Sequence, residues 1–286
     1  MVDKRKKVNR YSEDVFESLQ NDRDLSVVKR DDMIQKARLS LTVQEQRCVL
    51  YAITKIKPED KAFSEYTFDI KYFYELCGVE NRSYTRLKQI LRDLSDKSWW
   101  IVTDREKGEE SLVRWFSTLK VSQKSGKVTL KFHEDMMPYL LELAKQGRNG
   151  EFFTQYGLRF VLPMRSQFSP RLYELLKSYQ KNNHRWYFAV DDLRYLLDCQ
   201  QYTRWPDLRR RVIEPAINEI NEYTDLKISY DTETSGKKVV KVRFFILEKP
   251  ADQIGDIRIA IDKKLDGELD FEEIVKKMEN DLSWEV

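Results

Sequence analysis

The feature of this sequence that most constrains its fold is an internal repeat. Residues 66–79 (YTFDIKYFYELCGV) align with residues 186–199 (WYFAVDDLRYLLDC) at a constant offset of 120, so that Phe68 matches Phe188. A chain of 286 residues has room for two modest domains. Similarity at so long a period therefore indicates a duplicated domain.

The pattern continues in the same order after each repeated segment. A polar turn is followed by a second amphipathic helix and then by two β-prone segments around a Ser-Gly-Lys turn, at residues 115–132 and 226–247. An earlier helix opens each copy, at residues 42–56 and 169–180. Helix, helix, turn, helix and hairpin together make a helix-turn-helix with a β-hairpin wing. The sequence therefore predicts an α+β fold of two tandem winged-helix domains.

We expect the chain to divide into four regions. They are an N-terminal arm at 1–24, a first winged-helix domain at 25–150, a second at 151–250 and an acidic tail at 251–286. Between the two copies, residues 133–163 are expected to form a helix and then a connecting segment.

Local signals place several helix ends. Ser169 is expected to cap its helix, with Pro170 at the first helical position. Asp191 is expected to cap the helix that begins beside it. Pro215 lies inside the predicted helix at 202–220, where it should kink the helix or shift its hydrogen bonding.

This last helix, YTRWPDLRRRVIEPAINEI, holds three consecutive arginines. Its expected buried stripe is Leu208, Val212, Ile213, Ala216 and Ile220. Arg210 and Arg211 then point away from the core, while Arg209 lies closer to its boundary. In a winged helix this second helix of the motif lies in the major groove of DNA and the wing rests on the flanking backbone. Guanidinium groups suit both tasks, because they pair with guanine and contact phosphates.

The predicted DNA-binding residues lie on the second helix and the wing of each copy. In the second copy they are Arg204, Arg209, Arg210, Arg211, Asn218, Lys237, Lys238 and Lys241. In the first copy they are Arg82, Ser83, Thr85, Arg86, Lys88, Gln89, Arg92, Lys124 and Lys127. Other interpretations stay open, since a run of charge can be a solvated helix face, and the less basic first face can instead pack on a partner.

Charge is unevenly distributed along the chain. Residues 251–286 carry eleven acidic and five basic side chains, a net charge of −6 where the whole chain has +3, so the preceding residues carry +9. A basic body suggests a polyanionic partner. We hypothesise that the acidic tail competes with DNA for this basic surface. Residues 269–280 have the spacing of a short amphipathic helix, and the run before them is expected to be flexible and solvated.

The sequence offers little for catalysis. The only histidines, His133 and His184, form no cluster that could hold the metal of a rolling-circle nuclease. Neither Ser-Gly-Lys turn has the glycine spacing of a phosphate-binding loop. The adjacent carboxylates Asp31 and Asp32 are expected to begin a turn rather than to bind a metal. We therefore expect no enzyme activity, no cofactor and no metal site.

Cysteine content and hydropathy indicate the compartment. Cys48, Cys77 and Cys199 are widely spaced and are expected to be buried, reduced thiols. No apolar run reaches the length of a membrane helix, and residues 1–15 have charge without the hydrophobic stretch of a signal peptide. We expect a cytoplasmic protein without membrane contact.

Three segments, in this order, closely resemble one known family. They are residues 26–56 (SVVKRDDMIQKARLSLTVQEQRCVLYAITKI), 169–180 (SPRLYELLKSYQ) and 208–230 (LRRRVIEPAINEINEYTDLKISY). From about residue 25 to residue 247, the chain resembles the iteron-binding replication initiators of theta-replicating bacterial plasmids. The N-terminal arm and the acidic tail have no counterpart in this resemblance.

The resemblance implies two winged-helix domains in a pseudo-two-fold arrangement. It implies that a monomer grips direct repeats, the iterons, in the double-stranded DNA of a plasmid origin. Binding then helps to open the duplex and recruits the host's replication initiator and helicase in the bacterial cytoplasm. The resemblance also implies a homodimer, joined through the first domain, that represses the initiator's own gene at its operator and limits plasmid copy number. Residues 27–41 and the first-domain hairpin would rearrange between dimer and monomer.

Two alternatives stay open. A two-domain winged-helix transcriptional repressor would have the same fold but would bind an inverted repeat as a dimer. Winged helices also serve as protein-interaction modules, in which case the basic faces would bind an acidic partner. Stepwise occupancy of direct repeats by monomers would separate the initiator from both.

Overall fold

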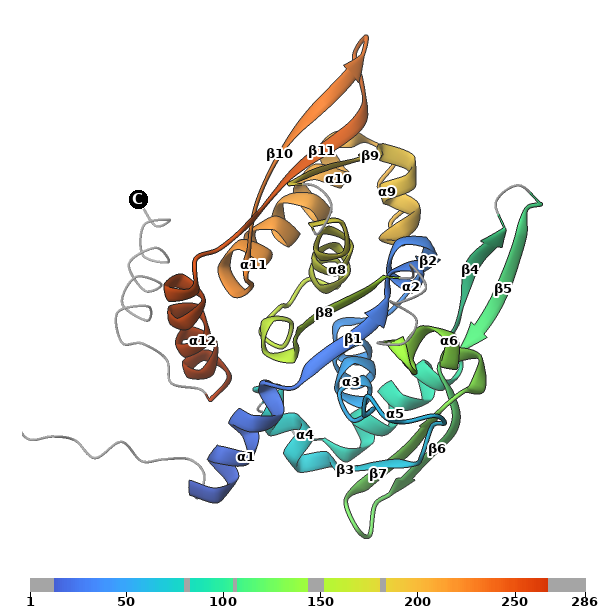
Figure 1. Cartoon of the computed structure of the whole chain (residues 1–286), viewed down its shortest axis with the longest axis vertical. Helices are drawn as coiled ribbons and strands as arrows, with labels where there is room; N and C mark the ends of the chain where they lie inside the picture. The colour runs from blue at the N-terminus through green and yellow to red at the C-terminus, as the bar shows by residue number, and fades with distance from the viewer. Residues whose placement is uncertain (1–12, 80–82, 105–106, 144–151, 181–183, 267–286) are drawn as a thin grey trace, which may run out of the picture.

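The computed structural model describes residues 13–79, 83–104, 107–143, 152–180 and 184–266. Figure 1 shows two helical clusters, with the hairpin of residues 226–248 projecting at one end of the molecule and the hairpin of residues 116–132 at the other. The elements before residue 144 are α1 (Glu13–Arg23), β1 (Ser26–Arg30), α2 (Asp31–Lys36), β2 (Ala37–Arg38), α3 (Val43–Ile53), β3 (Tyr66–Asp69), α4 (Ile70–Leu76), α5 (Tyr84–Ser95), β4 (Ser98–Asp104), β5 (Glu109–Arg114), β6 (Phe116–Ser122), β7 (Lys127–Phe132), η1 (Glu134–Met136) and α6 (Met137–Leu140). Those after residue 151 are β8 (Phe153–Gly157), η3 (Leu158–Phe160), α8 (Ser169–Gln180), β9 (Arg185–Ala189), α9 (Val190–Leu196), α10 (Trp205–Leu208), η4 (Arg209–Ile213), α11 (Glu214–Tyr223), β10 (Leu226–Ser235), β11 (Lys238–Glu248) and α12 (Ala251–Leu265).

The predicted pair of winged helices is confirmed by the matching order of elements. In the first copy α3, α4 and α5 are the three helices, and β6 and β7 are the wing. In the second copy α8, α9 and the helix from α10 to α11 are followed by the wing of β10 and β11. The strand before each helix-turn-helix joins the wing as an antiparallel partner, which gives the sheet orders β3-β7-β6 and β10-β11-β9.

The repeated phenylalanines occupy equivalent places in these two sheets. Phe68 lies opposite Val128 of β7, and Phe188 lies opposite Val242 of β11. All four side chains are buried. The residues that repeat in the sequence therefore occupy the same buried positions in both copies. In each copy, one apolar face of the wing sheet packs against the hydrophobic core.

Buried apolar side chains form one core that continues through both copies. The stripe predicted on the arginine-bearing helix is confirmed, because all five of its residues are buried: Leu208, Val212, Ile213, Ala216 and Ile220. The three cysteines are buried and free, as predicted. Within the part of the chain that the structure describes, the helices lack the length and apolar composition needed to cross a bilayer.

Two small sheets were not predicted from the sequence. β4 and β5 form a hairpin between α5 and the first wing, and β2 pairs with β4. β1 pairs antiparallel with β8, which places Ser26 opposite Gly157. β8 lies in the segment 133–163, where a helix and then a connecting segment were expected. The described residues there begin with the 3-10 helix η1 and the short α-helix α6, and the strand β8 in the expected connector was not predicted. The pairings of β1 with β8 and of β2 with β4 join segments far apart in the sequence, which local patterns do not reveal. The β4–β5 hairpin is local but was not recognised.

The prediction that Ser169 caps α8 was wrong. Its buried hydroxyl has no hydrogen-bond partner among the described residues. The hydroxyl of Ser166 instead accepts a hydrogen bond from the N–H of Phe168, 3.2 Å away, just before the helix. Ser169 is already the first residue of α8, so it lies one position too late to act as the N-cap.

The interpretation of the acidic pairs also needs correction. Asp191 is not the cap of α9, whose N-cap residue is Ala189; it lies in the first turn, 2.6 Å from Arg194. Asp31 and Asp32 begin helix α2 rather than a turn. Carboxylates in a first helical turn are still favourable, because they face the positive end of the helix dipole.

The start of the acidic tail is helical and packed, which corrects the expectation of a flexible, solvated run. α12 spans residues 251–265, and Ile261 and Leu265 on it are buried. α12 also contacts the end of α1, because the fully buried guanidinium of Arg23 lies 3.3 Å from Asp262 and 2.8 Å from Asp266. Figure 1 shows α12 running down from the second wing toward α1. The amphipathic helix expected at 269–280 lies outside the described residues.

Candidate DNA-binding surface

The arginine-bearing helix is interrupted by the π-helical segment η4 between α10 and α11. Pro215 lacks a backbone N–H, and its ring would clash with the carbonyl of Arg211 in a regular helix. The N–H of Glu214 donates to the carbonyl of Arg209, five residues back. The shift in hydrogen bonding predicted from Pro215 is therefore confirmed. A π turn holds more residues than an α turn, so the angle around the helix axis between successive side chains is smaller. Arg209, Arg210 and Arg211 therefore all remain on the solvent side of the helix.

These arginines project into solvent and are only loosely held by acids. The exposed fraction of the side chain is 78% for Arg204, 70% for Arg210 and 51% for Arg209. Asp207 lies 3.9 Å from Arg204 and 3.7 Å from Arg210, and Glu214 lies 3.4 Å from Arg209. Exposed ion pairs contribute about 0–1 kcal/mol each. A DNA phosphate or base can therefore replace either acid at little cost.

Arg211 and Asn218 extend the same surface. Both side chains are exposed, while Val212, which follows Arg211, and Ile217, which precedes Asn218, are buried. All five predicted residues of this helix are therefore exposed on its solvent side: the four arginines, which make a basic strip, and the neutral Asn218.

The lysines of the second wing lie at different distances from its tip. Gly236, with φ +61, makes the tight turn, and Lys237 and Lys238 beside it are exposed. Lys241 lies further back, with its ammonium 3.3 Å from Glu233 and 5.8 Å from the centre of the Tyr187 ring. Lys237 and Lys238 are thus better placed to reach a phosphate than Lys241.

A groove beside this wing was missed in the sequence. It is lined by Arg185, Trp186, Tyr187, Glu233, Lys241 and Arg243. Tyr187 is 62% exposed. The alternation of β9 puts Arg185 and Tyr187 on one face of the strand, a signal that was present in the sequence but was used only to establish the repeat.

The first copy presents its predicted polar face on α5. Thr85, Arg86, Lys88, Gln89 and Arg92 are all exposed. The Gln89 amide donates to Asp93 at 2.7 Å. Ser83 caps α5, since its hydroxyl accepts a hydrogen bond from the Arg86 N–H at 3.3 Å, so its side chain has a structural role. Arg82 lies outside the described residues.

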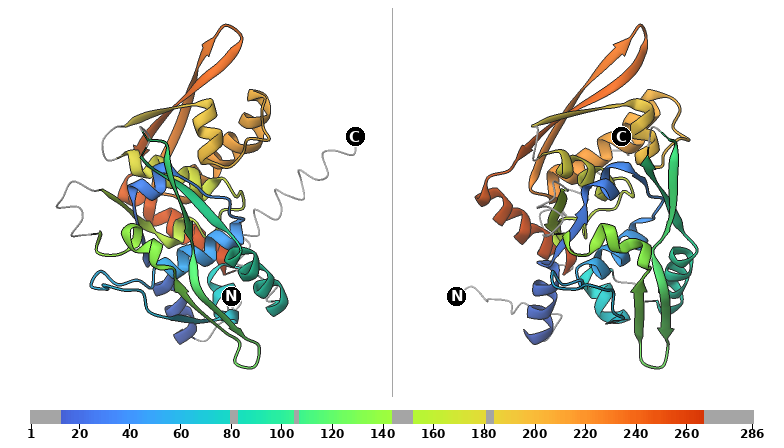
Figure 2. Two further views of the ribbon diagram at one scale, coloured as in Figure 1. Left: turned by 90° about the vertical axis from the view of Figure 1, so that its right-hand side faces the viewer. Right: turned by 45° about the vertical axis from the view of Figure 1, so that its right-hand side comes forward.

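The first wing adds Lys124 and Lys127, which are exposed on either side of Gly126. Figure 2 shows α5 and the helix from α10 to α11 on the same side of the molecule, with the two wings at its opposite ends. The predicted residues therefore form two basic surfaces, one on each copy, rather than a single site. Both surfaces can face one elongated partner.

An exposed apolar pair lies on the hairpin that the sequence did not predict. Trp100 of β4 and Leu112 of β5 face each other across the two strands. They are 48% and 45% exposed. Large apolar side chains paired on a solvent-facing sheet are typical of a protein interface.

Two family models match the chain, one for each copy. Residues 26–177 match the family described as Initiator Replication protein, WH1, and residues 189–246 match Initiator Rep protein, WH2. The first match continues through most of α8, whereas the expected division lay at residue 150. Both matches leave out α1 and α12.

Known proteins resemble the chain over much of its length. A replication initiation protein of Escherichia coli is 26% identical over 215 residues, which cover 72% of this chain and 65% of that protein. The PI protein of Escherichia coli is 29% identical over 155 residues, 49% of each chain. The chain thus spans less than two thirds of the length of either relative.

A solved structure shares the fold. The crystal structure of Pi initiator protein in complex with iteron DNA superimposes with a TM-score of 0.63 at 20% identity. The superposition covers 80% of this chain and 99% of that one. The tandem arrangement of two winged helices is therefore common to both.

Proposed function

The chain belongs to the family of initiator replication proteins, and from this premise we propose that it is a plasmid replication initiator that binds iterons, the direct repeats of an origin, in double-stranded DNA. The Pi initiator protein, which has the same fold, is bound to iteron DNA in its crystal structure. The geometry of the basic surfaces supports the same kind of ligand for this chain.

The observation that carries the proposal is the strip of exposed arginines on the second helix of a helix-turn-helix. The opposite side of this helix is buried in the core of the second copy, so the arginines are presented by a rigid element. We assign Arg210 and Arg211 to the major groove, where a bidentate arginine–guanine pair discriminates by about 1–3 kcal/mol. Lys237 and Lys238 at the wing are assigned to the flanking phosphates.

The first copy is proposed to hold a second stretch of the same duplex. Its α5 face is less basic, with Lys88 and Arg92 for phosphates and Gln89 for a base. Since α5 and the arginine-bearing helix lie on the same side of the molecule (Figure 2), we propose that one chain spans one repeat without a partner. This is the basis for proposing that the monomer is the form that occupies iterons.

We further propose that the chain forms a homodimer through the β4–β5 hairpin. The exposed pair of Trp100 and Leu112 supports this, because burying two large apolar side chains stabilises association. The dimer is proposed to repress the initiator's own gene at its operator, and the monomer to open the origin duplex and recruit the host's replication initiator and helicase in the bacterial cytoplasm.

Fluorescence anisotropy on a labelled duplex tests the DNA ligand. The duplex carries direct repeats from upstream of the gene, and a shuffled duplex of equal composition is the control. The proposal expects tighter binding to the repeats at every salt concentration, with an affinity that falls steeply between about 50 and 200 mM salt. Equal affinity for both duplexes would contradict it, and preference for an inverted repeat would favour a repressor.

A further inference from the structure

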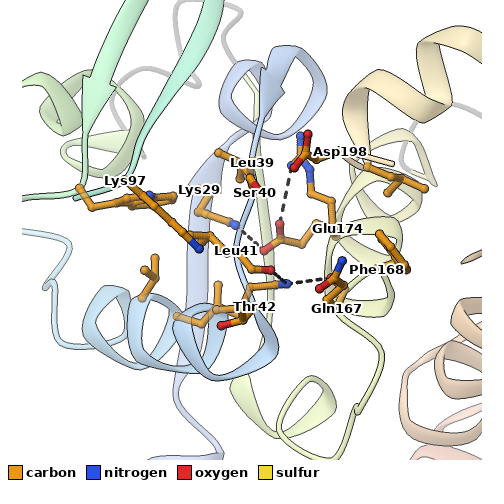
Figure 3. A pocket seen from close by; sticks show the side chains of 16 residues that line it. Lys29, Leu39, Ser40, Leu41, Thr42, Lys97, Gln167, Phe168, Glu174 and Asp198 are labelled. Atoms are coloured by element: carbon orange, nitrogen blue, oxygen red, sulfur yellow. Dashed lines mark hydrogen bonds and ion pairs between the residues drawn. The ribbon is translucent and has the colours of Figure 1, made fainter. Parts of the chain in front are cut away.

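A cavity of about 90 Å³ lies where the two copies meet. Its walls come from β1, the 39–42 loop, α3, α8 and the residues that end α9 (Figure 3). The space equals that of about three water molecules. It is therefore large enough for a small inorganic ion, but far smaller than a nucleotide site.

Three buried charged side chains reach this cavity. Lys29 is 2% exposed, Arg171 5% and Glu174 3%. The Lys29 ammonium forms an ion pair with the Glu174 carboxylate, and the hydroxyl of Tyr156 donates to the same carboxylate oxygen (Figure 3 shows the ion pair). Two buried cations thus share one carboxylate, which leaves one excess positive charge.

The other charged residues of the wall do not compensate for this charge. Lys97 is neutralised by Glu45, 2.6 Å away. Asp198 is neutralised by Arg38, also 2.6 Å away. Each pair is internally balanced, so the excess charge belongs to the group of Lys29, Arg171 and Glu174.

One N–H donor of the Arg171 guanidinium lacks an acceptor among the described residues. Its Nε donates to the carbonyl of Leu196 and its Nη2 to the carbonyl of Ala37. Its Nη1 has no hydrogen-bond partner among the described residues, and the nearest Glu174 oxygen, at 3.8 Å, lies beyond hydrogen-bond distance. Burial lowers the pKa of Arg171 to about 10 and also lowers the pKa of Lys29. A buried charge and a buried donor without a partner are both unfavourable.

We propose that the cavity binds one small oxyanion, of the size and charge of inorganic phosphate, held by the guanidinium of Arg171 and the ammonium of Lys29. The anion balances the excess charge and offers an acceptor to Nη1, which is covered in this structure and reaches the anion when the guanidinium turns toward the cavity. Arginine and lysine are the side chains that bind such oxyanions most often.

Binding would also join the two copies. Arg171 already bridges β2 of the first copy and the end of α9 of the second through its two carbonyl contacts. Lys29 comes from β1, on the first copy's side of the cavity. An anion held by both side chains therefore holds the two winged helices in one relative position.

Isothermal titration calorimetry on the full chain tests the site with sodium phosphate, at constant ionic strength maintained with sodium gluconate. We expect one saturable site per chain and a higher melting temperature in phosphate. Lys29→Met removes the excess positive charge while keeping the aliphatic stem, and is expected to weaken phosphate binding at least tenfold. Lys61→Met, an exposed lysine on the loop before β3, is the matched control and should bind as the original chain does.

Several outcomes would overturn the assignment. They are heat that does not saturate, a stoichiometry other than one, or unchanged phosphate affinity in Lys29→Met. If Lys29→Met does not fold, Arg171→Lys replaces it, because lysine keeps the charge but lacks the forked donors, and the same loss is expected. If free phosphate fails to bind while Lys29→Met weakens DNA binding, the anion is a DNA phosphate and the proposal of a free oxyanion is wrong.

Discussion

The backbone of Leu265, the last residue of α12, lies directly against Gly78, the residue that turns the chain after α4. A Cβ atom at Gly78 would lie 2.8 Å from both the Cα and the carbonyl oxygen of Leu265. Gly78 also has φ +63, a conformation that side chains disfavour. This contact joins the C-terminal helix of the second copy to the helix-turn-helix of the first.

Gly78→Ala is therefore expected to displace α12 and to destabilise the protein. The strained φ and the close contact with Leu265 together should cost about 1–3 kcal/mol. Gly255→Ala is the matched control, because Gly255 lies in α12 with nothing near its missing side chain. That substitution should stabilise the helix by up to about 1 kcal/mol. Urea unfolding of both variants measures the difference, and equal midpoints would show that α12 does not depend on this contact.

Arg210→Ala and Arg211→Ala are each expected to weaken binding to the direct repeats without loss of fold. Each removes a guanidinium from the solvent face, at a cost of about 1–3 kcal/mol in binding if it pairs with a base. Their melting temperatures should stay near that of the original chain, since neither residue packs in the core. Lys61→Ala is the control, because it also removes one positive charge from an exposed side chain but lies outside the proposed DNA-binding surfaces. Full affinity in both arginine variants would refute the assignment of this helix to the major groove.

Trp100→Lys is expected to favour the monomer. The substitution puts a charge in the centre of the proposed β4–β5 interface, where like charges of the two copies would meet. Sedimentation across a range of concentrations measures the shift. Leu247→Lys changes another apolar side chain, 51% exposed on β11, and should leave association unchanged. A dimer that survives Trp100→Lys must use another surface.

The three buried cysteines give a prediction that depends on pH. Burial raises the pKa of Cys77 to about 11 and that of Cys199 to about 12, and also raises the pKa of Cys48. At pH 8 the folded protein should therefore react with a disulfide reagent only as fast as it opens, whereas all three thiols should react at once in denaturant.

The raised pKa values of the three thiols also determine whether the stability of the protein rises or falls with pH. The pKa of each thiol is higher in the folded protein than in the unfolded chain. The contribution of the thiols to the free energy of unfolding is therefore complete below about pH 8.5, and it is lost as the pH rises toward the folded pKa values. Rapid modification of a thiol in the folded state at pH 8 would contradict the burial of all three. Serine variants, made one at a time, identify the thiol that reacts.

The sequence predicted those parts of the fold that repeat or that have a local signature. The offset between Phe68 and Phe188 revealed the duplicated winged helix, and Pro215 correctly indicated disturbed hydrogen bonding before α11. The sheet of β1 with β8 was missed because its strands are short and their pairing is not local.

The packing of α12 was missed for a related reason. A run rich in charge is typical of a solvated segment, but here Asp262 and Asp266 meet the buried guanidinium of Arg23 from the other end of the chain. The helical phase placed the exposed arginines correctly. Periodicity did not show that Lys241 lies against Glu233, since that ion pair depends on how the two strands of the wing are paired. The cap of α5 by Ser83 is local, because its partner Arg86 is only three residues away, but Ser83 was interpreted as a DNA contact instead.

The most direct test of the central claim is a titration of the purified chain on DNA from upstream of its own gene, with footprinting and mass determination of each complex. An initiator should fill directly repeated sites one after another, each complex gaining the mass of one chain. A single complex containing two chains on an inverted repeat would contradict this account and favour a dimeric repressor, and the absence of any footprint would leave the arginines as a solvated helix face.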